Sequence, residues 1–306
     1  MIGTLIFALL PIVVTIALGM YAAKIGDFEE KDSQKLTHLV LHYALPMNIF
    51  AGIWGTPRKV IIADIPLACW IVVGMLGSYL LVWFFLKKVR HVDASISVLR
   101  ALSIADPSVP FIGSAILPLL FAESIASIDI GISTLMINVV LLPIIFAQMA
   151  SISGEHVTFG ARVKQTLKKP LVFSALSAFV LSMLGLQIPE QLVNTFTVLG
   201  KSSGGLAMFA TGIILYSRDL KLTRQITINT LAKNIVVPCV IWGLMVLLRM
   251  PDDVIRVAVV TLAIPTATMP TSLAIKYKSG EAEMASTQFY TTIFAVVSLS
   301  FFMLIL

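Results

Sequence analysis

The chain has 306 residues, of which 58% are hydrophobic and only 12% are charged. Soluble domains contain about 45–50% apolar residues, so this composition and the mean hydropathy of +0.96 predict an all-α integral membrane protein. Apolar segments extend over the whole length, which leaves no room for a separate soluble domain. The net charge of +6 does not indicate a nucleic-acid partner, because no Lys/Arg patch is interleaved with aromatic residues on a long polar segment.

A hydrocarbon core of about 30 Å requires about 20 apolar residues in each helix that crosses it. On this measure the sequence predicts ten membrane-spanning helices in one membrane domain. They lie near residues 4–23, 36–54, 65–86, 97–121, 128–149, 170–187, 191–216, 227–249, 256–277 and 284–306.

The ten spans are predicted to form two repeats of five, residues 1–155 and 156–306. The stretch LSIADPSVP at 102–110 aligns without a gap with LAIPTATMP at 262–270. The same offset, 160 residues from Leu102 to Leu262, brings the other spans of the first half onto spans of the second. Because five is an odd number, the second repeat is inverted in the membrane relative to the first.

The basic residues predict the orientation of the chain. With ten spans, most of the 22 Lys and Arg residues fall in loops on one side, and the other side has Arg58, Lys59, Arg249 and Arg256. Basic loops concentrate on the cytoplasmic side of a membrane. We therefore expect both termini outside the cytoplasm and the protein in the inner (plasma) membrane of the cell.

The fourth and ninth spans are interrupted by proline. Asp106, Pro107 and Pro110 fall at the centre of the fourth span, and Pro265 and Pro270 occupy the ninth. Proline removes a backbone donor and clashes with the preceding turn, so each span should divide into two half-helices. Irregular backbone at membrane depth survives only against protein or water. The alternative is that these prolines simply kink their helices, but two breaks in register across an inverted repeat predict a binding site.

The chemistry expected at this site is anion binding. Each second half-helix begins with free N–H groups and the positive end of a helix dipole, which favours negative charge. Hydroxyl groups lie at the same level of the sequence, on Ser108, Thr266, Thr268 and Thr271.

Lys201 is the charged residue that most clearly lies inside a predicted apolar span. If the seventh span enters near residue 191 and rises about 1.5 Å per residue, Lys201 lies about 15 Å deep. An ionisable residue at that depth predicts a substrate or counter-ion role. Its neighbours Ser202 and Ser203 belong to the glycine-rich stretch LGKSSGGL, where the helix is expected to open locally. The alternative is a later helix start that leaves Lys201 at the interface.

Asp106 suggests coupling, because a carboxyl group at a helix break can take up a proton together with an anionic substrate. Two alternatives remain open: a pairing with Lys201, or capping of the unwound backbone. Asn48 and Asn138 either line the pathway or hydrogen-bond between helices.

Other polar groups are expected to be structural. Arg100 and Lys233 are interpreted as boundary anchors whose long stems reach the interface. His38 and His42 have no glutamate between them and no third ligand, so neither a metal site nor enzyme activity is expected. No cofactor is expected beyond H⁺ or Na⁺ as a coupling ion.

The stretches KLTHLVLHYALPMNIF, KKPLVFSALSAFVLSMLGLQIPEQLV and GKSSGGLAMFATGIIL, together with the two proline-broken spans, resemble the auxin efflux carrier family. The likeness is greatest to bacterial members described as malonate or malate permeases. It implies that spans four and nine cross at the substrate site, with Pro107, Pro110, Pro265 and Pro270 at the crossover. It also implies a scaffold of spans one, two, six and seven, a transport unit of spans three to five and eight to ten, and a homodimer formed through the scaffold. Many members have Asn where this chain has Ser108 and Gly where it has Pro110, so the substrate preference can differ.

Together these observations predict a secondary transporter of small organic anions, most readily a dicarboxylate such as malate or malonate, working by alternating access. A sodium-coupled carboxylate symporter is one alternative. An anion channel of the same fold is another, and turnover far above about 10³ s⁻¹ would favour it.

Overall fold

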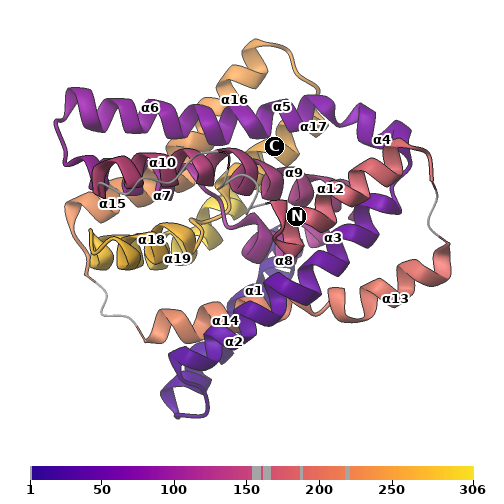
Figure 1. Ribbon diagram of the computed structural model, residues 1–306, viewed down its shortest axis with the longest axis horizontal. Helices are drawn as coiled ribbons and strands as arrows, with labels where there is room; N and C mark the ends of the chain where they lie inside the picture. The colour runs from indigo at the N-terminus through magenta and orange to yellow at the C-terminus, as the bar shows by residue number, and fades with distance from the viewer. Residues whose placement is uncertain (1, 154–159, 161–166, 187–188, 218–220) are drawn as a thin grey trace. The chain divides into compact units, whose positions relative to one another are not determined.

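The structure is a computed structural model that describes residues 2–153, 160, 167–186, 189–217 and 221–306 (Figure 1). Throughout these residues the regular structure is helical, apart from one isolated β-bridge. The predicted all-α class is therefore confirmed. Among the described residues, six helical runs are long and apolar enough to cross a membrane, namely Glu30–Trp54, Ile65–Val89, Glu123–Met149, Leu192–Tyr216, Arg224–Leu247 and Glu281–Ile305. Shorter apolar helices lie at Val14–Lys24, Ala94–Ala105, Val109–Leu120 and Pro170–Met183.

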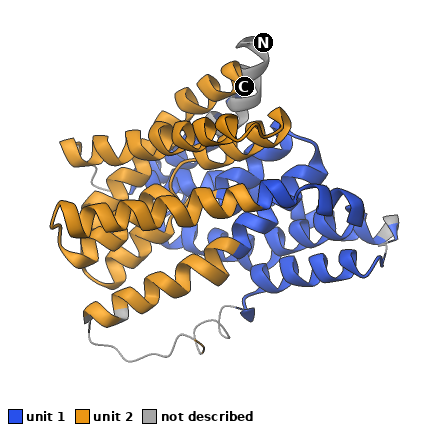
Figure 2. Ribbon diagram, turned by 90° about the horizontal axis from the view of Figure 1, so that it is seen from above, with its two compact units in different colours: residues 1–68, 109–135, 165–218 blue, residues 69–108, 136–164, 219–306 orange. Residues whose placement is uncertain are grey.

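The chain forms two compact units (Figure 2). Unit 1 comprises residues 1–68, 109–135 and 165–218, and unit 2 comprises residues 69–108, 136–164 and 219–306. The chain passes from one unit to the other several times, and one of these passages falls inside the fourth predicted span, between Ser108 and Val109. The predicted boundary between sequence repeats, at 155 and 156, lies outside the described residues, and the repeat division stays a prediction.

Unit 1 contains eleven described elements, eight of which come from its first segment or its central one. In the first segment they are α1 (Ile2–Lys24), α2 (Glu30–Leu39), the π-helix η1 (Val40–Ala44), α3 (Leu45–Trp54) and α4 (Arg58–Ala63). The other two segments supply η4 (Val109–Gly113), α8 (Ser114–Leu120), α9 (Glu123–Leu135), α12 (Pro170–Met183), α13 (Glu190–Gly200) and α14 (Ser203–Tyr216). The short α4 was not predicted.

The closest helix contact in unit 1 is between α1 and α14 (Figure 1). A Cβ atom on Gly19 would lie 2.1 Å from the carbonyl oxygen of Phe209, and one on Gly212 would lie 2.2 Å from the carbonyl oxygen of Ile16. Only glycine permits this backbone approach, which is typical of helices that pack inside a membrane. The contact fixes α14, whose first turn forms part of the site described below.

Unit 2 begins within α5 (Ile65–Val72), which continues into η2 (Val73–Gly77), α6 (Ser78–Phe84) and η3 (Phe85–Val89). It further contains α7 (Ala94–Ala105), η5 (Met136–Leu141), α10 (Leu142–Ser153), α15 (Arg224–Leu231), η6 (Ala232–Val236), α16 (Val237–Leu247), α17 (Asp252–Ala263), α18 (Met269–Lys276) and α19 (Glu281–Ile305). Its helix α7 packs against α6, α10, α18 and α19.

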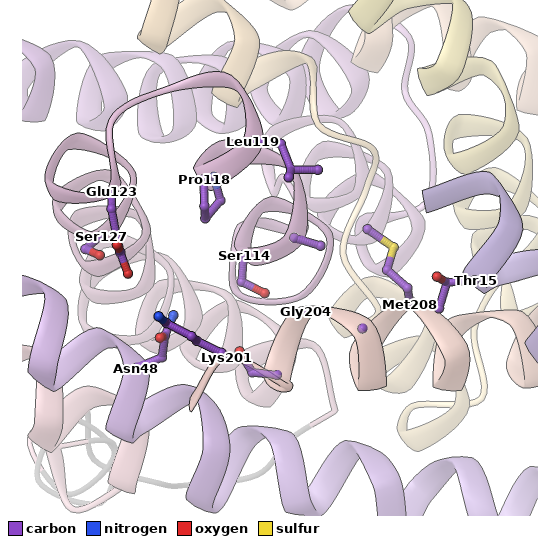
Figure 3. A pocket seen from close by; sticks show the side chains of 13 residues that line it. Thr15, Asn48, Ser114, Pro118, Leu119, Glu123, Ser127, Lys201, Gly204 and Met208 are labelled. Atoms are coloured by element: carbon purple, nitrogen blue, oxygen red, sulfur yellow. The ribbon is translucent and has the colours of Figure 1, made fainter. Parts of the chain in front are cut away.

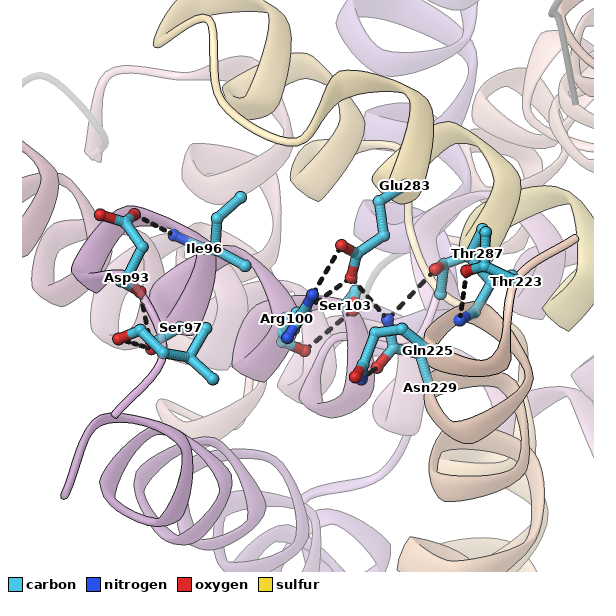
Figure 4. Close-up of polar contacts among 12 residues, drawn as sticks. Asp93, Ile96, Ser97, Arg100, Ser103, Thr223, Gln225, Asn229, Glu283 and Thr287 are labelled. Atoms are coloured by element: carbon cyan, nitrogen blue, oxygen red, sulfur yellow. Dashed lines mark hydrogen bonds and ion pairs between the residues drawn. The ribbon is translucent and has the colours of Figure 1, made fainter. Parts of the chain in front are cut away.

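A polar network ties three helices of unit 2 together (Figure 4). Arg100 on α7 donates from Nε to Oε1 of Glu283 over 2.6 Å and from Nη2 to Oε2 over 2.8 Å. Asn229 on α15 donates to the same Oε1 over 3.1 Å. The expectation that Arg100 is a boundary anchor is therefore wrong, because its guanidinium forms a bidentate ion pair with a carboxylate on α19. The network ties α7, α15 and α19 to one another.

Candidate functional site

Both predicted helix breaks are present. In the fourth span α7 ends at Ala105 and η4 begins at Val109, and in the ninth α17 ends at Ala263 and α18 begins at Met269. The second half-helices, η4 and α18, each start one residue before a proline, Pro110 and Pro270. Proline is favoured in the first turn of a helix, because a backbone N–H at that position would have no partner within the helix. The segments between the half-helices are extended or irregular.

The two breaks bond to each other. Pro107 and Thr266 form an antiparallel bridge, in which the backbone N–H of Ser108 donates to the carbonyl of Pro265 over 2.8 Å. The N–H of Ala267 donates to the carbonyl of Asp106 over 3.0 Å. Each unwound segment thus satisfies backbone groups of the other, which is what buried irregular backbone requires.

Two of the predicted hydroxyl groups are used internally. Thr266 donates from Oγ1 to the carbonyl of Ser103, and Thr271 donates from Oγ1 to Oε1 of Gln288 over 2.9 Å. Both threonines are buried, whereas Thr268 is half-buried. Their side chains hold the break together, so a role in contacting substrate stays a prediction.

Asp106 is fully buried, and neither of its carboxylate oxygens has a hydrogen-bond partner among the described residues. The alternative that its side chain caps the unwound backbone is therefore wrong. Lys233 is also fully buried in unit 2, on η6, which packs against α7. The interpretation of Lys233 as a boundary anchor is wrong as well.

Unit 1 contains a cavity of about 400 Å³ (Figure 3). Its walls come from the ends of α3, α8, α9 and α14, with one residue from α1. The lining residues are Thr15, Asn48, Ser114, Ala115, Pro118, Leu119, Glu123, Ser127, Lys201, Ser203, Gly204, Gly205 and Met208. Most of their polar groups are hydroxyls, together with one amide, one carboxylate and one ammonium.

The junction between α13 and α14 places Lys201 in this cavity. Helix α13 ends at Gly200, and a Cβ there would lie 3.0 Å from the backbone nitrogen of Asn48. A Cβ on Gly204 would lie 2.9 Å from Cα of Ala115, whereas one on Gly205 would meet nothing within 4 Å. The junction is thus held tightly against α3 and α8, and its open side faces the cavity. The predicted local opening of the seventh span at Lys201 and Ser202 is confirmed, since α14 begins at Ser203.

The side chain of Lys201 is exposed to the cavity, and its ammonium makes no hydrogen bond or ion pair within the part of the chain that the structure describes. Its side chain extends toward Asn48, and Glu123 and Ser127 reach into the same space from α9 (Figure 3). The first residues of α14 line the cavity, so the positive end of that helix dipole faces it. A lysine, a helix N-terminus and an amide in one cavity form a site for an anion.

The predicted site residues fall in two places. Asn48, Lys201 and Ser203 line the cavity of unit 1. Ser202 does not, because its Oγ donates to the carbonyl of Leu199 over 2.7 Å. The residues of the helix breaks from Asp106 to Ser108 and from Pro265 to Thr271 belong to unit 2, as does the buried Asn138 on η5. Pro110 lies in η4 of unit 1 and does not line the cavity.

Sequence reasoning missed the other polar groups of the cavity, notably Thr15, Ser114, Glu123 and Ser127. A serine or threonine inside an apolar helix carries no signal of the direction in which it points. Glu123 could have been found, because it is an acid at the start of an apolar span.

A helical protein with several apolar spans, two broken helices bonded to each other and a polar cavity that contains a lysine belongs to the class of membrane transporters. The chain belongs to a family described as membrane transport proteins, of the auxin efflux carrier type, whose sequence profile matches residues 4–163 and 157–303. It is 27% identical over 289 residues to the "Uncharacterized transporter YfdV" of Escherichia coli strain K12, covering 90% of this chain and 91% of that protein. The proteins of the same name from Escherichia coli O157:H7 and Shigella flexneri match equally. These relationships identify a transport protein and not an enzyme, in agreement with the family resemblance of the sequence.

Proposed function

We propose that this transporter is a secondary carrier of small organic anions, with a dicarboxylate of the size of malonate or malate as its substrate. The observation that carries the proposal is the ammonium of Lys201 in the cavity of unit 1, which has no hydrogen-bond or ion-pair partner among the described residues. An ammonium without a protein counter-ion is available to a carboxylate, and such charge-assisted hydrogen bonds are about twice as strong as neutral ones.

The size and lining of the cavity support a small polar substrate. Its volume of about 400 Å³ is near the lower end of the range for small-molecule sites. A carboxylate on Lys201 has the amide of Asn48 beside it and the first turn of α14 below it (Figure 3). The hydroxyl of Ser127 offers a further hydrogen bond to a second polar group. Glu123 would accept a hydrogen bond from a hydroxyl or a protonated carboxyl group of the substrate.

We further propose the family arrangement for the whole chain: ten spans in two inverted five-helix repeats, both termini outside the cytoplasm in the inner membrane, and a homodimer formed through spans one, two, six and seven. Broken helices bonded to each other are typical of carriers that work by alternating access around a central site. Coupling to protons through Asp106 is proposed, with sodium coupling as the alternative.

The proposal is tested by uptake of labelled malonate and malate into proteoliposomes with an imposed proton or sodium gradient. Lys201→Ala removes a hydrogen bond to a charged group, worth about 1.5–3 kcal/mol, so the kcat/KM for uptake should fall about 10–100-fold. Lys59→Ala is the matched control, because Lys59 is an exposed lysine of unit 1 outside the cavity.

Two results would contradict the proposal. If Lys201→Ala transported both acids as the parent does, the cavity would not be the substrate site. If the parent itself took up neither acid under either gradient, the dicarboxylate would be the wrong substrate, and aromatic or monocarboxylate anions would be tried next.

A further inference from the structure

Unit 2 contains a cavity of its own, with a volume of about 320 Å³. Its walls come from α6 and the following η3, from the first turns of α7 and from the end of α10. The lining residues are Trp83, Lys87, Ala94, Val98, Ala147, Gln148, Ser151 and Ile152. The cavity shares no lining residue with the cavity of unit 1 and includes no residue of the two helix breaks.

This cavity lies at one end of a membrane span. The apolar run Ile65–Val89 is long enough to cross a bilayer, and Lys87 is two residues from its end. Lys88 and Arg90 adjoin it in the sequence, and Trp83 lies one helical turn before it. Basic residues and tryptophan at the end of an apolar span are typical of the level of the lipid headgroups. The cavity is therefore at the depth where headgroups lie.

The cavity carries a positive charge. The ammonium of Lys87 lies 5.1 Å from the centroid of the Trp83 ring, a cation–π contact that holds it at the cavity wall. It has no hydrogen-bond or ion-pair partner among the described residues, and no carboxylate is among the lining residues. The acid nearest in sequence, Asp93, uses its carboxylate to cap the start of α7. The charge of Lys87 is thus available to a ligand.

The other polar groups of the cavity can donate hydrogen bonds. The side-chain carbonyl of Gln148 accepts a hydrogen bond from the hydroxyl of Tyr79, which is fully buried. This bond leaves the amide N–H groups of Gln148 as donors, and they meet no acceptor in the part of the chain that the structure describes. Ser151 adds an exposed hydroxyl. A ligand that satisfies these groups has to supply acceptor oxygens, which is the chemistry of an anion.

The remaining wall of the cavity is apolar. Val98 is 1% exposed, whereas Ile152 is 45% exposed, so the apolar wall continues from the cavity to the outer surface of the unit. A small soluble anion gains nothing from such a wall. A molecule with a charged head and an apolar tail uses both parts, because its tail buries apolar surface while its head binds the donors.

We propose that this cavity binds the headgroup of an anionic phospholipid from the surrounding bilayer. The phosphodiester oxygens accept hydrogen bonds from Lys87, Gln148 and Ser151, and the acyl chains leave along Ile152. Basic pockets between membrane helices are known to hold anionic headgroups. The volume of the cavity accommodates a headgroup and not the acyl chains, which remain in the bilayer. The inference goes beyond the proposed transport function and does not depend on the substrate.

The first test is a titration of the purified protein in detergent with phosphatidylglycerol, followed by native mass spectrometry. Lys87→Ala should raise the dissociation constant about 5-fold, the value of one basic contact to an anionic lipid. Lys88→Ala is the matched control, because Lys88 is an exposed neighbour that does not line the cavity, and its effect should stay below about 2-fold. Equal losses for both variants, or none for either, would overturn the proposal.

The second test separates a lipid from a free phosphate. Phosphatidylcholine with the same acyl chains carries a compensating positive charge and should bind the parent more weakly than phosphatidylglycerol. Inorganic phosphate and glycerophosphoglycerol lack the acyl chains and should not displace the lipid at equal concentration. Displacement by either, or equal binding of the two lipids, would show that the ligand is not an anionic phospholipid.

The third test keeps every charge and fills the cavity. Ser151→Trp places a large side chain at an exposed position of the cavity wall, so binding of phosphatidylglycerol should weaken at least as much as in Lys87→Ala. Unchanged binding would place the lipid elsewhere and overturn the proposal. Unfolding midpoints of both variants should match the parent in lipid-free detergent, since both positions are exposed. None of these tests measures transport, so failure of malonate or malate uptake leaves their results unaffected.

Discussion

Lys201 and Lys233 both lie in predicted membrane spans, yet one side chain is exposed in a cavity of unit 1 and the other is completely buried in unit 2. Lys201 has no partner among the described residues and stands at a helix junction with two glycines in the following turn. Lys233 is bonded to a helix-end carbonyl, the carbonyl of Leu262 in the last turn of α17. The first environment leaves a charge available to a ligand, whereas the second uses its charge inside the protein.

The comparison shows that the position of a charged residue along an apolar span does not determine the environment of its side chain. The sequence placed Lys201 deep and Lys233 near a boundary, but neither position says which face of the helix carries the side chain. Lys233 lies in the π-helix η6, whose wider turn shifts every following residue relative to the 3.6-residue period. A face predicted from regular helix geometry is therefore wrong beyond that turn.

The strongest test of this difference is reversal of each charge. Lys233→Glu places a carboxylate in a buried site and leaves the carbonyl of Leu262 without its donor. We expect a loss of more than about 4 kcal/mol and no folded protein. Lys201→Glu changes an exposed side chain, so its stability should stay within about 0.5 kcal/mol of the parent. Size-exclusion profiles and unfolding midpoints of the purified variants measure both.

Equal yields and equal unfolding midpoints for Lys233→Glu and Lys201→Glu would contradict this difference, since they would show that the side chain of Lys233 is in contact with water. As a control for volume, Lys233→Met keeps the length of the side chain without a negative charge and should be more stable than Lys233→Glu.

A smaller difference in stability is expected between variants that remove a polar side chain from unit 2 and from unit 1. Arg100 makes a bidentate ion pair with Glu283, and the two side chains are 15% and 19% exposed. Arg100→Ala should cost about 1.5–3 kcal/mol, the value of a hydrogen bond to a charged group. The side chain of Asn48 is half-buried in the cavity wall and makes no hydrogen bond with a described residue, so Asn48→Ala should leave the midpoint nearly unchanged.

Chemical unfolding of both variants checks this difference, and Arg100→Lys refines it. Lysine keeps the charge but cannot form the bidentate fork, so its midpoint should lie between those of the parent and Arg100→Ala. A larger loss for Asn48→Ala than for Arg100→Ala would show that the cavity wall, and not the network of Figure 4, stabilises the protein.

The sequence predicted those features that depend on local chemistry. Pro107 and Pro265 each lack the backbone N–H that a helix interior requires, and the glycines after Lys201 weaken the helix at that point. The cavity and the buried charges could not be predicted, because they depend on which helix faces meet. The pairing of Arg100 with Glu283 joins residues 183 positions apart, and no local pattern records such a contact. Three predicted residues nevertheless share one cavity, since Lys201 and Ser203 are neighbours and Asn48 packs on the glycine before them.

The smallest predicted effect concerns the start of α7, the helix that leads to Asp106. The carboxylate of Asp93 accepts hydrogen bonds from the backbone N–H of Ser95 over 2.9 Å and of Ile96 over 3.2 Å. The hydroxyl of Ser95 also donates to it and is the largest cause that lowers the pKa of Asp93. Asp93→Ala should cost about 0.5–2 kcal/mol at neutral pH, since the helix loses its N-cap.

The lowered pKa gives this cap a pH dependence of known sign. A carboxylate whose pKa is lower in the folded state stabilises the protein above its ordinary pKa, and this contribution is lost as the pH falls through the folded value. The unfolding midpoint of the parent should therefore decrease below about pH 4, and that of Asp93→Asn should decrease less, because the amide keeps the cap without titrating. The same acid response in both proteins would assign it to other carboxylates. Since α7 carries Arg100 and ends at the break, an effect at its start would also show how far the stability of the break depends on the helix before it.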